Sequence, residues 1–541
     1  MGRIVTREGV IPLHDDAITL NSQSYYTMGP VRGNAVSPWT TGLKVGRATY
    51  DEQLHAFYLV LDDFSAGIGY RRLDIREALG SVHDNPGGVD IRRARHITLP
   101  PLQTVTALGT IPTAYTYTAR KPQFSGPIAA SDISGSQAHY AGLGNSIYKS
   151  TDGGATWTLI AGAVIANAYM IARILQFTPS AAGGVPALYV FPEGTSGAAR
   201  YQRSTDGATF ADGGSGTQKV IEDAIIWQEK IIGTRPIAEI IFSADGQTWN
   251  IDVAADAEVI WKAGYGRVTF IGEFMAPWGS SAVHFLAVNG NTGMIELFAL
   301  GFAQRLAINI PLGLRRTLLD GIVWNGQIIV TDGMSVWSFD GSNVRDISFP
   351  RHKGLPPTLQ NALIWGFLGG TDYLYAMLVT NGGGAQVMVY NGAGWAQLEP
   401  SIATFAPACG SIVAKQSGVD TARRLVSLGA NTFAAAAGSR YLTSPLGFFA
   451  DVPLVNFDTF QDGPLAFRTG WIDGGFADLS GALYWMFCDG YNINSTETVK
   501  VGYRLDNDET AAFTTLATFT AAGQRAWFTA DKKGLEFRTV Q

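Results

Sequence analysis

The chain has 541 residues, a net charge of -6 and only 16% charged residues, against a usual value of about 25%. Its hydrophobic content of 46% excludes a disordered chain, and its 64 glycines indicate many turns. The negative charge argues against a general nucleic-acid binder, because such proteins gather Lys and Arg to displace phosphate counterions. No apolar run has the length of a signal peptide or a membrane span. We therefore expect a folded protein without a secretion signal or a membrane span.

Residue types that usually build catalytic or metal sites are few and scattered. The two cysteines are Cys409 and Cys488, and none of the seven histidines has the spacing to a cysteine or to another histidine that a metal site needs. Phosphate-loop, dinucleotide and serine-nucleophile motifs are absent from the sequence. The sequence predicts two buried thiols, no metal, no cofactor and no catalytic residue.

Residues 1–118 show no repeat and are predicted to form an N-terminal extension or arm. The run LHAFYLVLDD predicts a strand, and residues 74–82 predict a short helical turn. The later run HDNPGGVDIRRARHITLPPLQT is broken by proline and glycine, which is typical of an irregular extended segment.

Arg92, Arg93 and Arg95 form the one basic concentration of this acidic chain. They are candidates for a contact with an acidic neighbouring subunit or for a surface that faces passing DNA. The alternative is a solvated arm, in which these arginines pair with nearby acids such as Asp84 and Asp90.

The strongest signal is a turn motif that recurs at intervals of roughly 40 to 55 residues. Its first copy fills the pattern S-x-D-x-G-x-T-W, and two further copies each lack one residue of it. The motif residues are Ser150, Asp152, Gly154, Thr156 and Trp157; Ser204, Asp206, Gly207, Thr209 and Phe210; and Ser243, Asp245, Gly246, Thr248 and Trp249. Weaker copies follow around Asp340 and Asn391.

Each copy lies between two runs of alternating apolar residues, so it is predicted to form a hairpin turn. The Asp carboxylate accepts hydrogen bonds from N–H groups of its own turn, and the Gly supplies a positive φ. These residues are therefore predicted to be structural.

A recurring unit of this length, with four short strands, is typical of a propeller blade. We predict an all-β protein with a β-propeller in residues 119–451. Seven blades are expected, at residues 120–162, 165–213, 218–254, 258–302, 305–350, 358–400 and 405–450. The N-terminal extension is a candidate for the strand that closes the ring.

Residues 452–541 change pattern again. Short apolar runs such as ETVKVGYRLDND and TTLATFTAAG are separated by polar turns at intervals of about 10 to 20 residues. This pattern predicts a C-terminal β-sandwich.

The turn motifs resemble the Asp-boxes, or bacterial neuraminidase repeats, of sialidases and other β-propellers. In those families the boxes lie at outer blade turns, away from the central opening where propellers usually bind ligands. The resemblance implies a propeller fold and, as an alternative function, a sialidase-like or other glycan-cleaving or glycan-binding protein. Sialidases carry R-[IL]-P ahead of the first box, whereas this chain has Arg3-Ile4-Val5 without the proline.

The C-terminal run resembles the β-domain that follows a propeller in tail structural proteins of tailed bacteriophages. Its opening turn contains Trp471, Asp473, Gly474 and Gly475, and Val499, Val501 and Tyr503 share one strand face. The alternative is an ordinary carbohydrate-binding sandwich. Glycan-reading aromatics would then be sought among Trp278, Trp365 and Trp395, although stacking between blades is the other use for such residues.

The phage resemblance implies a non-enzymatic virion structural protein in the tail, either in the nozzle or in host attachment. Its expected partners are other tail proteins, further copies of the chain in a homo-oligomeric ring, host surface glycan, and DNA that passes without specific binding. It would be assembled in the host cytoplasm and located in the virion.

Overall fold

The computed structural model describes short segments between residues 3 and 110, most of residues 126–249, and segments 268–275, 283–289, 294–299 and 305–311. It further describes most of residues 318–398, three segments between 406 and 446, and short segments between 467 and 537. Every regular element in these residues is a β-strand. No helix among them is long and apolar enough to cross a membrane.

Five blades are each built from four consecutive antiparallel strands. The first contains β9 (Ile128–Ser131), β10 (Ala138–Leu143), β11 (Ser146–Ser150) and β12 (Thr158–Val164). The second contains β13 (Ala168–Phe177), β14 (Ala187–Gly194), β15 (Gln202–Ser204) and β16 (Ala211–Asp212). The other three are β20 (Val268–Phe274), β21 (Val283–Asn289), β22 (Met294–Ala299) and β23 (Arg305–Pro311); β24 (Asp320–Trp324), β25 (Gln327–Thr331), β26 (Val336–Phe339) and β27 (Val344–Asp346); and β28 (Leu363–Gly369), β29 (Leu374–Val379), β30 (Ala385–Tyr390) and β31 (Trp395–Gln397).

Two more sheets differ from these blades in the number or the origin of their strands. One contains three strands, β17 (Asp223–Trp227), β18 (Lys230–Arg235) and β19 (Glu239–Ser243). The other contains β32 (Ala406–Ala414), β33 (Arg423–Ala430) and β34 (Gly438–Leu446), and its fourth strand is β8 (Thr104–Thr110) from the N-terminal segment. β8 pairs antiparallel with β34, with Thr104 opposite Thr443 and Thr110 opposite Gly438.

The predicted number of seven like blades is therefore wrong in the described residues, which form five. The repeat spacing predicts where a unit begins, but not whether its fourth strand follows in sequence. In the segment predicted at 405–450, three strands are local and the fourth comes from the other end of the chain.

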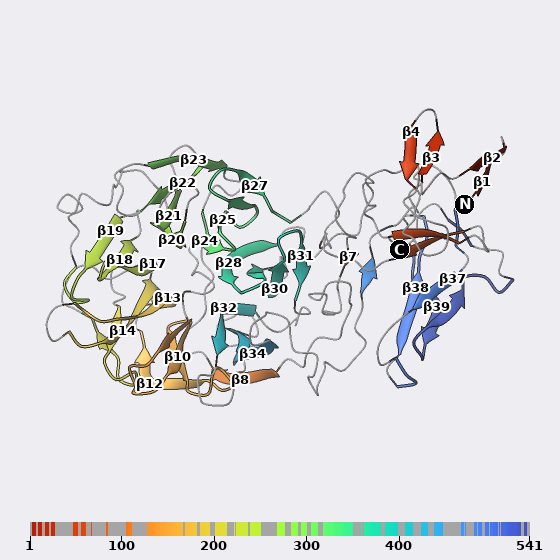
Figure 1. Cartoon of the computed structure of the whole chain (residues 1–541). Helices are drawn as coiled ribbons and strands as arrows, with labels where there is room; N and C mark the ends of the chain where they lie inside the picture. The colour runs from red at the N-terminus through yellow and green to blue at the C-terminus, as the bar shows by residue number, and fades with distance from the viewer. Residues whose placement is uncertain are drawn as a thin grey trace.

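The sheets follow one another around a ring, with the first strand of each nearest the middle (Figure 1). The hydrophobic core lies between neighbouring sheets. Val426 and Leu428 of β33 pack with Leu143 and Trp157 of the first blade, so the last sheet also meets the first. The propeller fold is thus established by its sheets and by the core between them.

The chain ends form only two-stranded pairs in the described residues. On the N-terminal side β1 (Arg3–Thr6) pairs with β2 (Gly9–Pro12), β3 (Ala17–Leu20) with β4 (Gln23–Tyr26), and β5 (Arg47–Asp51) with β6 (Ala56–Val60). On the C-terminal side β36 (Gly481–Leu483) pairs with β41 (Leu535–Phe537), β37 (Trp485–Cys488) with β40 (Gln524–Trp527), and β38 (Val499–Tyr503) with β39 (Thr514–Phe519). β7 (His83–Asp84) pairs with β35 (Arg468–Thr469), which ties the two flanks together.

Three predictions for the flanks remain without support from these strands. The separate pairs do not by themselves make two packed sheets, so the C-terminal sandwich is not confirmed. The helical turn at 74–82 lies outside the described residues, as do Arg92, Arg93 and Arg95.

Candidate functional site

The three strong turn motifs fold into closely similar turns at residues 150–157, 204–210 and 243–249, which we call the aspartate turns. Each joins the third strand of a sheet to the residues that follow it. Their glycines Gly154, Gly207 and Gly246 have φ values of 80°, 66° and 69°, a conformation that side chains other than glycine rarely adopt.

In the first aspartate turn, Asp152 accepts hydrogen bonds from side chains and from the backbone of its own turn. Its Oδ1 accepts from Ser150 Oγ at 2.8 Å and from the backbone N–H of Thr156 at 2.9 Å, and its Oδ2 accepts from the Thr156 hydroxyl. Ser150 Oγ in turn accepts from the N–H of Gly154 at 2.9 Å, and Trp157 Nε1 donates to the Gly154 carbonyl at 3.2 Å. The five motif residues are thus all used within one turn.

The other two aspartate turns have a similar arrangement, and each is one residue shorter than the first. Asp206 accepts from the N–H groups of Ala208 and Thr209 at 2.8 and 2.7 Å, and Asp245 from those of Gln247 and Thr248 at 2.7 and 2.6 Å. The hydroxyls of Ser204 and Ser243 each donate to their aspartate at 3.0 Å.

The weak copies around Asp340 and Asn391 keep only part of this pattern. Asp340 accepts hydrogen bonds from the backbone N–H groups of Ser342 and Asn343. The neutral Asn391 accepts through its Oδ1 from the N–H groups of Ala393 and Gly394. The turn itself therefore needs an acceptor oxygen but not a charge.

These hydrogen bonds keep the carboxylates ionised. Donation by the backbone of Thr209 and Ala208 holds the pKa of Asp206 well below its usual value. Burial alone would raise the pKa of Asp152 and Asp245, but the hydrogen bonds that each receives outweigh it and lower both pKa values. A general acid needs a raised pKa near the working pH, so these aspartates are poorly suited to acid catalysis.

Each aspartate turn also holds a backbone carbonyl toward the preceding sheet. Tyr140 of β10 donates to the Gly207 carbonyl at 3.1 Å, and Tyr201, directly before β15, donates to that of Gly246 at 3.1 Å. At the point where the ring closes, Arg424 Nη1 of β33 donates to the carbonyl of Gly153 at 3.2 Å. The aspartate turns therefore fasten one sheet to the next.

Two Gly→Ala substitutions separate the effect of the neighbouring sheet on an aspartate turn from the effect of backbone strain. Gly246 and Gly326 have φ values of 69° and 68°, but a Cβ at Gly246 would lie 2.0 Å from Tyr189 Oη whereas one at Gly326 would meet nothing. We expect Gly326→Ala to cost about 1 kcal/mol from the positive φ alone. Gly246→Ala should cost at least about 1 kcal/mol more, measured by urea unfolding. Equal losses of stability in Gly246→Ala and Gly326→Ala would show that the neighbouring sheet does not constrain the aspartate turn at Gly246.

The aspartate turns also predict how stability depends on pH. Because the folded-state pKa of Asp206 and Asp245 lies below the ordinary 3.8, their ionised forms stabilise the fold at neutral pH. This contribution is lost as pH falls below 3.8 through the folded-state values. The double variant Asp206→Asn, Asp245→Asn should therefore be less stable at pH 7 and lose less stability on acidification than the natural chain. Parallel stability profiles for the two proteins would contradict this.

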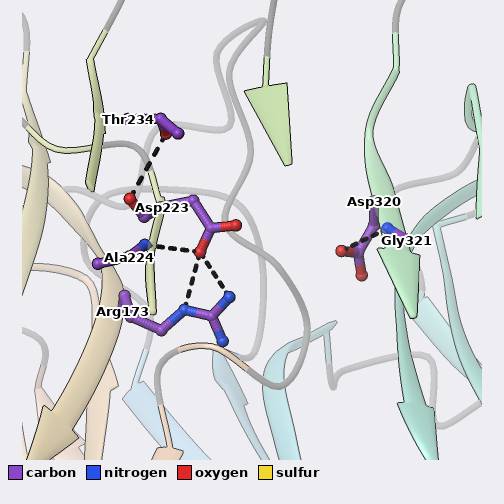
Figure 2. A network of polar contacts seen from close by, with 6 residues as sticks. All are labelled: Arg173, Asp223, Ala224, Thr234, Asp320 and Gly321. Carbon is purple, nitrogen blue, oxygen red and sulfur yellow. Dashed lines mark hydrogen bonds and ion pairs between the residues drawn. The ribbon is translucent and has the colours of Figure 1, made fainter. Parts of the chain in front are cut away.

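A second constellation lies on the first strands of neighbouring sheets, and its side chains are drawn in Figure 2. Asp223 is the first residue of β17, is 2% exposed, and accepts from Arg173 Nε of β13 at 2.8 Å, from Arg173 Nη2 and from the N–H of Ala224. Thr234 of β18 donates its hydroxyl to the Asp223 carbonyl at 3.5 Å. The ion pair joins two neighbouring sheets and is largely removed from water.

Asp320 occupies the same position on β24 (Figure 2). It is also 2% exposed, and it accepts from the N–H of Gly321 at 2.9 Å and from the N–H of Phe367, on β28 of the next sheet, at 2.8 Å. Asp223 and Asp320 stand opposite Thr234 and Thr331 in the register of their sheets. Both carboxylates therefore bridge neighbouring sheets.

The sequence also contains a repeated pattern at this second constellation, separate from the turn motifs. Residues 223–234 and 320–331 read DAIIWQEKIIGT and DGIVWNGQIIVT, which share D-x-I-x-W-x-x-x-I-I-x-T. Two copies of a twelve-residue pattern that begins with Asp would have identified both buried carboxylates.

The remaining candidates are not brought together. Trp365 and Trp395 are 4% and 1% exposed and belong to the core between sheets, so their faces are not available to a glycan, and Trp278 lies outside the described residues. Cys488 is not in a disulfide and is half-buried, contrary to the expected burial. Among the described residues, no three His, Cys, Asp or Glu side chains gather as a metal site would require.

No family model matches the chain, and no curated protein matches it in sequence. Among solved structures it is similar to YCF48 from Cyanidioschyzon merolae, at 12% identity over 63% of this chain and 99% of that chain, with a TM-score of 0.38. It is also similar to a chain of a mitotic checkpoint complex, at 9% identity over 64% and 96% of the two chains with a TM-score of 0.39. An Aleuria aurantia lectin matches at 14% identity over 54% and 98%, with a TM-score of 0.31. These likenesses carry no conclusion about function.

Proposed function

We propose that this chain is a non-enzymatic structural protein of a tailed-bacteriophage virion, located in the tail and acting as an oligomer. The observation that carries the non-enzymatic part is the use of its buried and turn carboxylates. Asp152, Asp206 and Asp245 accept hydrogen bonds within their turns, and Asp223 and Asp320 bridge sheets. These five carboxylates therefore hold the turns and the sheets of the ring together.

The virion assignment is supported by the resemblance of the C-terminal flank to phage tail proteins. A ring closed by its own N-terminal strand suits a particle component, since closure removes exposed sheet edges that would otherwise pair at random. We also propose that the aspartate turns are Asp-boxes. In this proposal the protein is assembled in the host cytoplasm and is located in the nozzle or in the host-attachment apparatus of the tail.

The proposal is tested on particles purified from cells that produce this chain. Mass spectrometry of gradient-purified particles should find the chain at a fixed ratio to the other tail proteins, and antibody-gold should label the tail. If the chain is absent from intact particles, the assignment fails.

The alternative function, a sialidase-like or other glycan-cleaving protein, is tested on the same protein. Purified chain should leave sialylated and capsular glycans intact, with an authentic sialidase as positive control. Release of sugar at a rate proportional to the protein concentration would favour the glycan-cleaving alternative, and the acids responsible should then lie outside the aspartate turns.

A further inference from the structure

The outer strand β31 is buried, in contrast to the outer strands β16 and β27. All three residues of β31, Trp395–Gln397, are buried, whereas Ala211–Asp212 of β16 and Val344–Asp346 of β27 are exposed. An outer strand has no further strand of its own sheet beside it, so its burial requires a cover from another part of the chain. The burial of β31 therefore points to a contact with a segment outside its sheet.

Gly67 of the N-terminal flank lies directly on this strand. It is buried, and a Cβ at this position would lie 2.5 Å from the backbone N and 2.6 Å from the backbone O of Trp395. The φ of Gly67 is 82°, which residues other than glycine rarely adopt. The backbone of the N-terminal flank thus rests against the backbone of β31, and only glycine allows so close an approach.

The same flank reaches the next sheet of the ring through β8. Because β8 and β34 are antiparallel and Thr104 stands opposite Thr443, the chain that leads into β8 and the chain that leaves β34 lie at the same end of the sheet. Separation of these two chains would break the pairing one residue at a time, beginning at Thr104. Leu108 packs against the core cluster between the last sheet and the first blade. Peeling from Thr104 is therefore expected to stop at Leu108.

Between Gly67 and β8 the flank is tied to the C-terminal side at β7. His83 stands opposite Thr469, and Asp84 stands opposite Arg468. This pair lies outside the ring, on the side of β31 and β34 (Figure 1). Residues 85–103 connect it to β8, and residues 447–467 connect it to β34. The pair of β7 with β35 therefore holds together the two chains whose separation would peel β8 from β34.

We propose that residues 67–110 form a strap that fastens the last two sheets of the ring from outside. The strap is seated at Gly67 on β31 and at β8 on β34, and the pair of β7 with β35 keeps the Thr104 end of β8 from peeling. Loss of one seat loosens the other, so the strap opens and closes the ring as one unit. This inference concerns the ring itself and does not depend on the virion role.

Hydrogen exchange of the full-length protein, followed by mass spectrometry, tests the seat at Gly67. Gly67→Ala should raise the exchange rate of the Trp395–Gln397 amides by at least about fivefold, because the β31 backbone leaves no room for a Cβ. Gly135→Ala is the matched control, since Gly135 has a φ of 83° and nothing around its Cβ position. This control should leave exchange at Trp395–Gln397 unchanged. Equal exchange rates at these amides in the two variants would overturn the seat.

A disulfide between β7 and β35 tests whether the strap acts as a unit. The variant His83→Cys, Thr469→Cys places the two thiols on residues that stand opposite each other, a spacing that a disulfide can bridge, in a chain with Cys409→Ala and Cys488→Ala. Oxidation should slow exchange at Thr104–Ala107 by at least about threefold, because it removes the freedom of the chain that leads into β8. Exchange at Leu108–Thr110 should be the same in both redox states.

Combination of this disulfide with Gly67→Ala completes the test. In the reduced protein Gly67→Ala should raise exchange at Thr104–Ala107, and oxidation should cancel that rise. A disulfide from Ala17→Cys and Tyr26→Cys, which joins β3 to β4 within the N-terminal flank, is the control and should change nothing at Thr104–Ala107. If exchange there responds neither to Gly67→Ala nor to oxidation of the first disulfide, the contacts are independent and the strap is wrong.

Discussion

Asp223→Ala is expected to lower the free energy of unfolding by about 3 to 5 kcal/mol. The substitution removes the carboxylate that pairs with Arg173 in an interface where Asp223 is 2% exposed, and it removes the acceptor for the N–H of Ala224. Breaking a buried pair costs more than the pair contributes, because the remaining charge stays desolvated. Urea unfolding followed by tryptophan fluorescence measures the effect.

Two further variants distinguish this explanation from a general intolerance to substitution. Asp346→Ala, at an exposed residue that accepts one local N–H, should change stability by about 1 kcal/mol or less. The double variant Arg173→Met, Asp223→Leu should recover much of the loss, because neither charge is left buried. If the double variant is less stable than Asp223→Ala, the pair contributes in some other way.

The second large effect is expected on removing β8. Deletion of residues 1–112 takes away the strand that pairs with β34 along Thr104–Thr110, so the sheet that joins the last blade to the first loses its fourth strand. Deletion of residues 1–103 keeps β8 and is the matched control. We expect the longer deletion to lower the melting temperature by at least about 5 °C relative to the shorter one and to increase aggregation through the exposed edge of β34.

A synthetic peptide of residues 102–112 should restore part of this loss when added to the longer deletion. Restoration by a peptide of scrambled sequence would show that the effect is not strand pairing. Equal melting temperatures of the two deletions would show that β8 does not hold the ring.

The two constellations differ in how far the sequence predicts them. The aspartate turns are local: Asp206 and its two backbone donors lie within three residues, so residue types and spacing are enough to predict a structural turn. Arg173 and Asp223 are 50 residues apart and meet only because β13 and β17 are neighbours in the ring. Their pairing depends on tertiary structure and is not visible in either local sequence.

The blade count failed for a related reason. The interval between turn motifs predicts a repeating unit of four strands, but the sheet of β32, β33 and β34 obtains its fourth strand from Thr104–Thr110, some 300 residues away in sequence. The sequence TVTALGT is a short uncharged run with no feature that marks it as a ring-closing strand. Which N-terminal strand closes the ring is therefore fixed by packing of the last sheet against the first, not by local propensity.

Two of the three glycan candidates, Trp365 and Trp395, failed because exposure cannot be inferred from neighbouring turn residues. Trp395 follows the turn at Asn391, yet it is 1% exposed and donates its indole N–H to the Ile347 carbonyl of the preceding sheet at 2.6 Å. A tryptophan beside a turn is in this case a contact between sheets.

The central claim is that this chain forms a closed ring in the tail of a virion. A cryo-electron microscopy reconstruction of the tail tests it most directly. The predicted result is density for a propeller in several symmetry-related copies, with the strand Thr104–Thr110 completing the sheet of β34. A tail reconstruction in which every ring is accounted for by other proteins would contradict it.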